Sequence, residues 1–164
     1  MKRLASFLTT LAVLNVASLM LVSATWAATT VSKQRVVMEA KAIVGPGGGT
    51  FVVTPQGHGP LKSDAGKFTF TVSQKEVVRS GQSVIIFTST STWAGKRGTM
   101  VLRERFDDVA AGGNGYRVGT GVWSLLSARG TGQYAGLSGS GRSAYVVTPQ
   151  ERLFFRWEGF VTKP

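Results

Sequence analysis

The chain has 164 residues, a formal net charge of +11, 21 glycines and no cysteine. The lack of cysteine excludes disulfides, zinc fingers, iron–sulfur clusters and thiol-nucleophile chemistry. The length suits one domain with one hydrophobic core.

The first residues have the pattern of a secretory signal. A short basic start precedes the mostly apolar run Leu4 to Val22, and Ala27 offers a small residue at the cleavage position. An uncleaved membrane anchor, which needs about 20 predominantly apolar residues, is the alternative. We therefore expect a secreted or periplasmic protein in which 1–27 is a cleaved signal helix and 28–164 is a single β-barrel domain.

Removal of this segment leaves a net charge of +9. A basic excess favours anionic partners. For an exported protein these are anionic lipids or envelope polymers, reached by surface charge, and we expect no nucleic acid. The alternative is that the charge serves solubility only. The densest basic pieces hold the candidate anion-contacting residues, which are Lys96, Arg97, Arg103 and Arg105.

Alternation of apolar and polar residues predicts seven to nine strands and no amphipathic helix after the signal. The main runs lie in residues 35–44, 50–54, 68–73, 84–93, 99–106, 116–126, 140–147 and 152–161. The fold class is therefore all-β, either a small antiparallel barrel of about eight strands or a β-sandwich. Glycines recur at the ends and middles of strands, as the corners of a barrel require, so we favour the barrel.

Glycine is densest between Gly112 and Gly141, where ten of thirty residues are glycine and the rest resemble strand. Each glycine inside a helix costs about 1 kcal/mol relative to alanine, so this stretch is not helical. Gly130-x-Gly132-x-x-Ala135 has the letters of a dinucleotide fingerprint, but that motif needs a following helix. We expect a barrel turn there instead.

Residues 119–141 read GTGVWSLLSARGTGQYAGLSGSG. They resemble a pattern in small exported bacterial proteins of unknown function, in which a G-x-W strand precedes G-T-G-x-Y-x-G-L-x-G-x-G. Gly98 to Leu102 and Phe106 to Asp108 resemble the same group. That group in turn resembles the eight-stranded barrels of allene oxide cyclase and of dirigent proteins. The resemblance covers about residues 95–161 and implies a barrel; no catalytic residue is transferred by it.

The run from Met100 to Phe106 places a carboxylate among apolar residues. Met100, Leu102, Glu104 and Phe106 share one face, whereas Val101, Arg103 and Arg105 share the other. We expect the apolar face to point inward. Burial then raises the pKa of Glu104, and a carboxyl of this kind in a cavity is a candidate general acid–base group. The alternative is a paired carboxylate near the barrel rim or on the outside. Glu158 in the last strand is the second candidate.

Aromatic residues in or beside strands are candidates for a ligand cavity, although most such residues are plain core. The candidate ligand-binding residues are Trp93, Met100, Phe106, Trp123 and Trp157. An eight-stranded barrel is either filled by side chains or just wide enough for one small ligand.

Metal and cofactor motifs are missing from the sequence. His58 is the only histidine and is expected in an exposed loop between Pro55 and Pro60. Asp107-Asp108 has no calcium-loop spacing around it, so we expect it in a turn that ends a strand. There is no P-loop. We therefore expect no metal and no cofactor.

Three functions remain open from the sequence. The favoured one is a non-enzymatic exported barrel that binds a small apolar or amphiphilic ligand or an envelope component. The second is an enzyme of the cyclase or isomerase kind, with Glu104 or Glu158 as the acid–base group in an apolar cavity. The third is a structural or interaction module on the anionic cell envelope. A hollow barrel favours the first two over the third.

Overall fold

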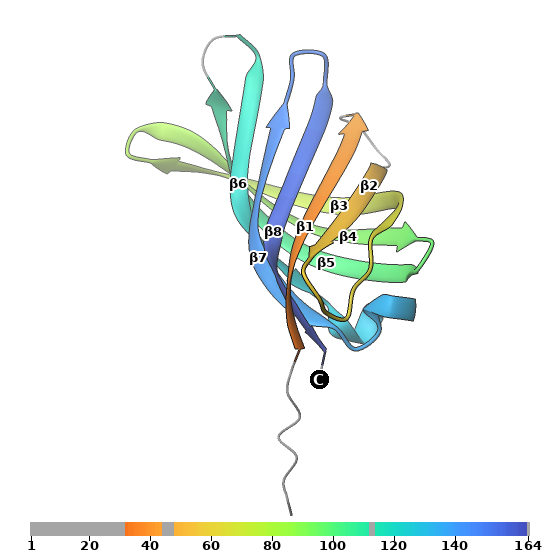
Figure 1. The fold of residues 1–164 in the computed structure, drawn as a ribbon. Coiled ribbons are helices and arrows are strands. Elements are labelled where there is room, and N and C mark those ends of the chain that lie inside the picture. The colour runs from red at the N-terminus through yellow and green to blue at the C-terminus, as the bar shows by residue number, and fades with distance from the viewer. Residues whose placement is uncertain (1–31, 44–47, 112–113, 164) are drawn as a thin grey trace, which may run out of the picture.

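The computed structural model describes residues 32–43, 48–111 and 114–163, so the predicted signal peptide lies outside the described residues. The described chain forms one antiparallel sheet in which each strand pairs with the next and the last pairs with the first (Figure 1). The predicted all-β fold is confirmed, and the sheet closes into a barrel instead of forming a sandwich. The strands are β1 (Ser32–Ile43), β2 (Gly49–Gln56), β3 (Asp64–Arg79), β4 (Gln82–Gly95), β5 (Gly98–Ala111), β6 (Tyr116–Leu125), β7 (Ser138–Val147) and β8 (Arg152–Lys163).

The inward and outward faces follow the alternation predicted from the sequence. On β5, Met100, Leu102, Glu104 and Phe106 are buried, while Arg103 and Arg105 are exposed. Successive side chains of a strand point to opposite faces. Val101, on the outward face of β5, is nevertheless buried as well. β1 and β8 obey the same rule, with Val36, Met38, Ala40, Trp157 and Val161 inside the barrel.

The glycine-rich connection between β6 and β7 lies where the sequence predicted a turn. Residues 127–129 and 132–134 form two single-turn 3₁₀ helices, and β7 begins at Ser138, two residues before the predicted run. Gly132 and Gly136 have positive φ values of 58° and 70°, which glycine adopts readily. The predicted turn is confirmed, with two short 3₁₀ helices that were not predicted, and it lies across one end of the barrel.

That end of the barrel is closed by loops and their side chains. Leu61 from the β2–β3 loop and Tyr134 and Leu137 from the β6–β7 connection are buried in the main core. Buried Gln34 holds the first loop, because its amide oxygen accepts from the Leu61 N–H at 2.8 Å. Buried Asp64 holds the second, because it accepts from the Tyr134 hydroxyl at 2.9 Å.

The barrel interior next to this closed end is packed with aromatic rings. The ring centroids of Trp93 lie 4.8 Å from Phe51, 5.4 Å from Phe68 and 4.7 Å from Trp157. Contacts of this kind stabilise the core beyond the area they bury. The hairpins β1–β2, β3–β4, β5–β6 and β7–β8 turn at the opposite end (Figure 1).

Candidate functional site

A cavity of about 250 Å³ opens at the hairpin end of the barrel. It occupies the interior that the packed aromatic core leaves free. Its walls are apolar and mostly aromatic, formed by Phe70, Phe87, Phe106, Tyr145, Leu153 and Phe155. Such a concave, largely apolar space with a few polar groups is the usual form of a small-molecule site.

Glu104 of β5 lies at the inner part of this cavity and is 4 % exposed. Its Oε2 accepts hydrogen bonds from the hydroxyls of Ser89 at 2.8 Å and Ser91 at 2.9 Å. Its Oε1 accepts from the indole N–H of Trp157 at 2.6 Å. The strand register explains this arrangement. Ser89 pairs directly with Glu104, and Ser91, two residues further along β4, is the next residue that faces inward. A buried carboxyl needs such partners.

The direction of the hydrogen bonds around Glu104 follows from their donors. Trp93 donates its indole N–H to the Ser91 hydroxyl at 2.8 Å, so the Ser91 hydrogen is directed at Glu104. Trp157 can only donate. Ser89 has no such second partner among the described residues, and its hydroxyl can either donate to Glu104 or accept from it. Ser89 is therefore the partner that can take a hydrogen bond from a protonated Glu104.

Burial raises the pKa of Glu104 above the usual value of 4.5, because the ionised form loses its hydration. Hydrogen bonds from Ser89, Ser91 and Trp157 act against this rise and do not cancel it. The carboxyl thus holds its proton to higher pH than an exposed glutamate. In its protonated form the carboxyl is a hydrogen-bond donor as well as an acceptor.

A second polar group lies nearer the mouth of the cavity. Asp108 is 2 % exposed and accepts from Nη2 and Nε of Arg117 at 2.8 and 3.0 Å. The Tyr145 hydroxyl donates to the other carboxylate oxygen, Oδ2. Burial, and then this hydrogen bond to Asp108, raise the pKa of the Tyr145 phenol above its usual value of 10.0. Asp108 is therefore fully compensated within the protein.

This arrangement corrects the prediction that Asp107-Asp108 ends a strand. Both residues lie within β5, which continues to Ala111. Asp108 points into the barrel, whereas Asp107 lies on the outside and its Oδ2 accepts from Nη1 of Arg79 at 2.6 Å. The buried aspartate is tolerated because Arg117 and Tyr145 come from the two strands that follow it across the sheet.

The five candidate ligand-binding residues occupy different layers of the barrel. Trp157 and Phe106 line the cavity. Trp93 lies deeper in the barrel and does not line the cavity. It contacts Glu104 indirectly, because its indole N–H donates to the Ser91 hydroxyl. Met100 and Trp123 are buried in the core cluster and do not line the cavity. The structure therefore brings two of the five predicted residues to the cavity.

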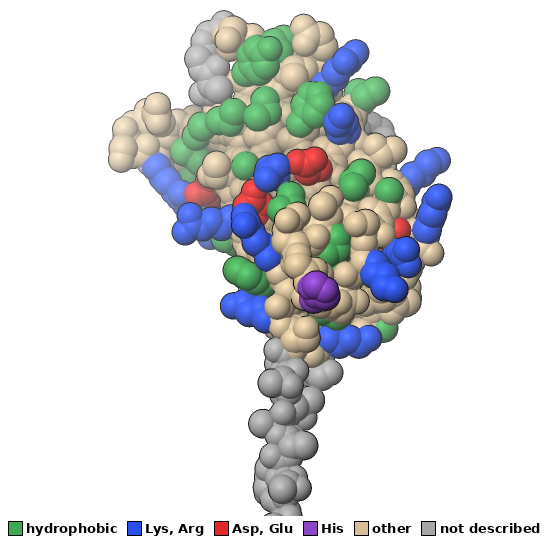
Figure 2. Space-filling view, in the orientation of Figure 1, with side chains coloured by type: hydrophobic (Ala, Val, Ile, Leu, Met, Phe, Trp, Pro, Cys, Tyr) green, Lys and Arg blue, Asp and Glu red, His purple; other side chains and the backbone are tan. Residues whose placement is uncertain are grey.

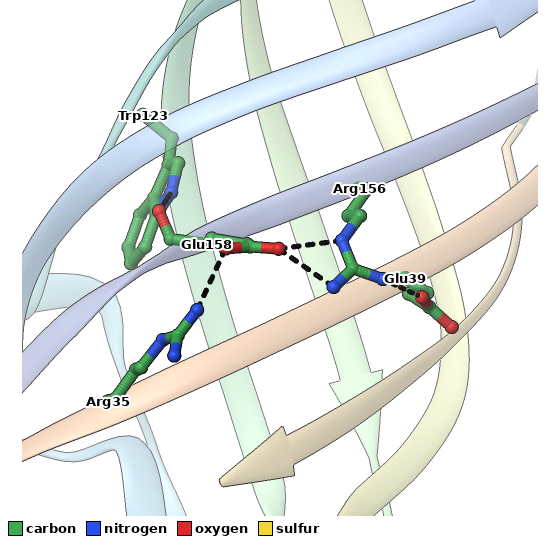
Figure 3. Close-up of polar contacts among 5 residues, drawn as sticks. All are labelled: Arg35, Glu39, Trp123, Arg156 and Glu158. Carbon is green, nitrogen blue, oxygen red and sulfur yellow. Dashed lines mark hydrogen bonds and ion pairs between the residues drawn. The ribbon is translucent and has the colours of Figure 1, made fainter. Parts of the chain in front are cut away.

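Glu158 is on the outside of the barrel (Figure 3). Its Oε1 accepts from Nη2 of Arg156 at 2.7 Å and its Oε2 from Nη2 of Arg35 at 3.1 Å, and Arg156 also contacts Glu39 at 2.7 Å. The hydrogen bonds from Arg156 and then Arg35 lower the pKa of Glu158. Its carboxyl faces solvent, so it is not the acid–base group of the apolar cavity.

The candidate anion-contacting residues fall into two groups. Lys96 and Arg97 form the β4–β5 turn at the closed end, where both are exposed. Arg103 and Arg105 lie on the outer face of β5, and Arg105 is 3.8 Å from Asp107. The four side chains therefore do not form one patch. His58 is exposed in the β2–β3 loop, as expected.

Several site residues were not predicted from the sequence. Ser89 and Ser91 lie in a Ser/Thr run of β4 whose alternate members share the inward face with Trp93. The alternation of Ser89, Ser91 and Trp93 on one face of β4, next to a carboxylate expected to be buried, is the pattern from which they could have been predicted. Asp108, Arg117 and Tyr145 carry no local signal, because their contact depends on the pairing of three strands.

No protein-family model matches the chain, and no curated protein matches it. Within the described ranges, no helix is long and apolar enough to cross a membrane. The same ranges hold no group of three or more His, Asp or Glu side chains placed to bind a metal ion. The description of the candidate site therefore rests on the distances, burial and charges of its residues and not on a comparison with a known protein.

Proposed function

We propose that the barrel binds one small, uncharged and largely apolar molecule in the cavity at its hairpin end. The cavity itself carries this proposal, since an interaction module has no need of a hollow barrel. Its volume of about 250 Å³ lies just below the usual range of about 300–1,000 Å³ for ligand pockets. A compact ligand of one or two ring systems fits that size better than an extended lipid chain.

The charges of the cavity favour a neutral ligand. Asp108 is compensated by Arg117, and the raised pKa of Glu104 favours its neutral form. A charged ligand would lose its hydration without gaining an unpaired opposite charge, which is costly. A carbonyl, hydroxyl or ether oxygen on the ligand could accept a hydrogen bond from Glu104 or Ser89. Aromatic walls would contact the remainder of the molecule.

The proposal is tested by filling the mouth of the cavity. N-phenyl-1-naphthylamine, a neutral fluorescent molecule of two aromatic units, is the probe. Val147→Phe places bulk in the cavity, because Val147 lines it. Val146→Phe is the matched control, because Val146 is the adjacent residue and points outward. We expect Val147→Phe to weaken probe binding at least ~10-fold and Val146→Phe to leave it unchanged. Equal binding by both variants and the wild type would place the probe elsewhere and contradict the proposal.

Acid catalysis on the bound molecule is a second candidate function. The observation that favours it is a carboxyl with a raised pKa that reaches the cavity. A positioned general acid contributes about 10²–10⁴-fold to a rate. Glu104→Gln keeps the shape of the side chain and removes the acid, so a binder retains probe affinity and an enzyme loses turnover. Glu158→Gln is the matched control on the outer surface.

Export is part of the proposed role. The sequence of residues 1–27 supports a secreted or periplasmic location, and the resemblance of residues 95–161 to small exported proteins agrees with it. The relation to allene oxide cyclase and dirigent barrels stays a prediction, supported by the eight-stranded closed sheet.

A further inference from the structure

The closed end of the barrel carries basic side chains without exposed acidic ones among the described residues. Six exposed residues form this basic end, which are Lys33, Lys62, Lys96, Arg97, Arg129 and Lys163. They come from the start of β1, the end of β8 and all three loops that close the barrel. Residues far apart in the sequence therefore place the same charge on one end of the molecule.

The acidic residue of this end, Asp64, does not neutralise that charge at the surface. It is buried, and its oxygens accept from the Tyr134 hydroxyl and from the backbone N–H groups of Lys96 and Arg97. Its hydrogen bonds shape the β4–β5 turn and leave the ammonium group of Lys96 free to face solvent. Arg97 is oriented by a 2.9 Å hydrogen bond from its Nε to the Ser63 carbonyl.

The remaining acidic residues lie on the barrel wall or toward the hairpin end. Glu39 and Glu158 are paired with arginines on the wall formed by β1 and β8. Asp107 and Asp108 lie in the hairpin half of β5. In Figure 2 Lys and Arg side chains lie over the whole visible face, whereas the acidic side chains lie above the single histidine. The basic end thus differs from the rest of this face in lacking exposed acidic partners.

The outer wall next to the basic end also suits a lipid surface. On the adjacent outer wall, Phe160 is 46 % exposed and the Lys33 ammonium lies 4.3 Å from the centre of its ring. An exposed ring beside a lysine can enter the headgroup region while the ammonium contacts phosphate.

We infer that the basic end docks on an anionic lipid bilayer, with the mouth of the cavity facing away from the membrane. The charge complementarity and the exposed Phe160 beside Lys33 both select this end. In this orientation the cavity exchanges its ligand with the aqueous phase. The inference does not depend on what the cavity binds.

Partitioning of the chain from Ala28 onward, the form expected after signal cleavage, into vesicles tests the docking. Vesicles of phosphatidylcholine alone are compared with vesicles that also contain phosphatidylglycerol, so the two differ in surface charge. We expect anionic lipid to strengthen binding, and the effect to weaken as salt rises. Replacing four basic-end residues should reduce the anionic preference at least ~10-fold. The substitutions are Lys62→Gln, Lys96→Gln, Arg97→Gln and Arg129→Gln.

A matched control removes the same charge from other exposed positions. Its substitutions are Lys41→Gln, Lys75→Gln, Arg142→Gln and Arg152→Gln, all outside the basic end. We expect this variant to keep most of the anionic preference. An equal loss in both variants would mean that net charge alone acts, and would overturn the inference. Binding of the wild type to an anionic polysaccharide but not to anionic vesicles would overturn it as well.

The orientation has its own readout, because the chain contains no cysteine and a single label can be introduced. Ala128→Cys lies at the basic end and Gln150→Cys in the β7–β8 turn beside the cavity mouth, and both positions are exposed. An environment-sensitive dye should shift to the blue on anionic vesicles at position 128 and not at position 150. A shift at position 150 alone would show the opposite orientation and refute the inference.

Discussion

The ring of Tyr145 lies over Gly119, the residue directly opposite it in the neighbouring strand β6. A Cβ atom on Gly119 would be 2.3 Å from Cε1 of that ring. Gly119 also pairs with Asp108 on its other side. The missing side chain therefore provides the space across which the Tyr145 hydroxyl reaches the Asp108 carboxylate.

Gly119→Ala should destabilise the protein through this contact. The added methyl group displaces the Tyr145 ring, and Asp108 loses its phenol donor while remaining buried. Overpacking and a lost hydrogen bond to a charged group together predict a loss of about 1–3 kcal/mol in the free energy of unfolding. Urea denaturation measures it. A double-mutant cycle with Tyr145→Phe provides the control, because part of the loss then disappears. Full additivity of the two substitutions would contradict the proposed coupling.

The Glu104 carboxyl should make stability fall as pH rises. Its pKa is raised in the folded protein, so the folded state binds more protons than the unfolded state. The stabilising contribution is complete below the unfolded value of about 4.5 and is lost as pH rises through the folded pKa. Glu104→Gln should remove this slope, leaving the variant relatively more stable toward neutral pH. Urea denaturation from acid to neutral pH compares the two proteins.

Glu158→Gln controls for the loss of a carboxylate as such. The pKa of Glu158 is lowered, so its contribution is present above the unfolded pKa and is lost as pH falls through the folded one. In the window above the unfolded pKa it is ionised in both states. This variant should therefore keep the wild-type slope there. A flat profile for Glu158→Gln, or an unchanged slope for Glu104→Gln, would assign the pH dependence to another group.

The sequence predicted the faces of the strands well, because alternation with period two is a local property. The inward face of β5, including Glu104, follows from Met100, Leu102 and Phe106. By the same argument Glu158, which follows the inward-facing Trp157 in β8, must face outward. Its proposed role as a cavity group was wrong for that reason. Local reasoning was sufficient wherever one strand decided the outcome.

The cavity and its polar groups could not be predicted from the sequence. Whether a barrel is hollow depends on the summed volumes of inward residues from all eight strands. In β4 the inward-facing Ser89 and Ser91 have small side chains and leave space for the cavity, whereas Trp93, the next inward-facing residue, is large and fills the core. The contact of Asp108 with Tyr145 depends on the register across Gly119, which links residues 37 positions apart. Such non-local pairings leave no pattern in a single segment.

Tyr134→Phe should weaken the closed end of the barrel. The phenol of Tyr134 donates to Asp64 at 2.9 Å, and its removal leaves one buried carboxylate oxygen with fewer partners. We expect a loss of about 1–3 kcal/mol in the free energy of unfolding. Tyr116→Phe is the matched control, because Tyr116 is exposed and should change stability little. Equal effects of the two substitutions would indicate that the Asp64 contact does not hold the loop.

Alkaline pH should act on the same contact. Burial, and to a lesser degree Asp64, raise the pKa of Tyr134 above the usual 10.0, so the folded protein keeps the phenol protonated. The stabilising contribution is present below pH 10 and is lost as pH rises further. Wild-type stability should therefore fall more steeply above pH 10 than that of Tyr134→Phe. Parallel profiles in urea denaturation would speak against this assignment.

The final prediction concerns the N-terminus of the exported protein. If residues 1–27 are a cleaved signal, the mature chain begins near Ala28, a few residues before the first described residue of β1, Ser32. The barrel then loses no described strand on cleavage, because β1 pairs with β8 from Ser32 onward and with β2 from Arg35 onward. Mass spectrometry of the protein from its native compartment should give the mass of a chain that starts near Ala28. An intact chain recovered from the membrane fraction would instead support an uncleaved anchor attached to the basic end.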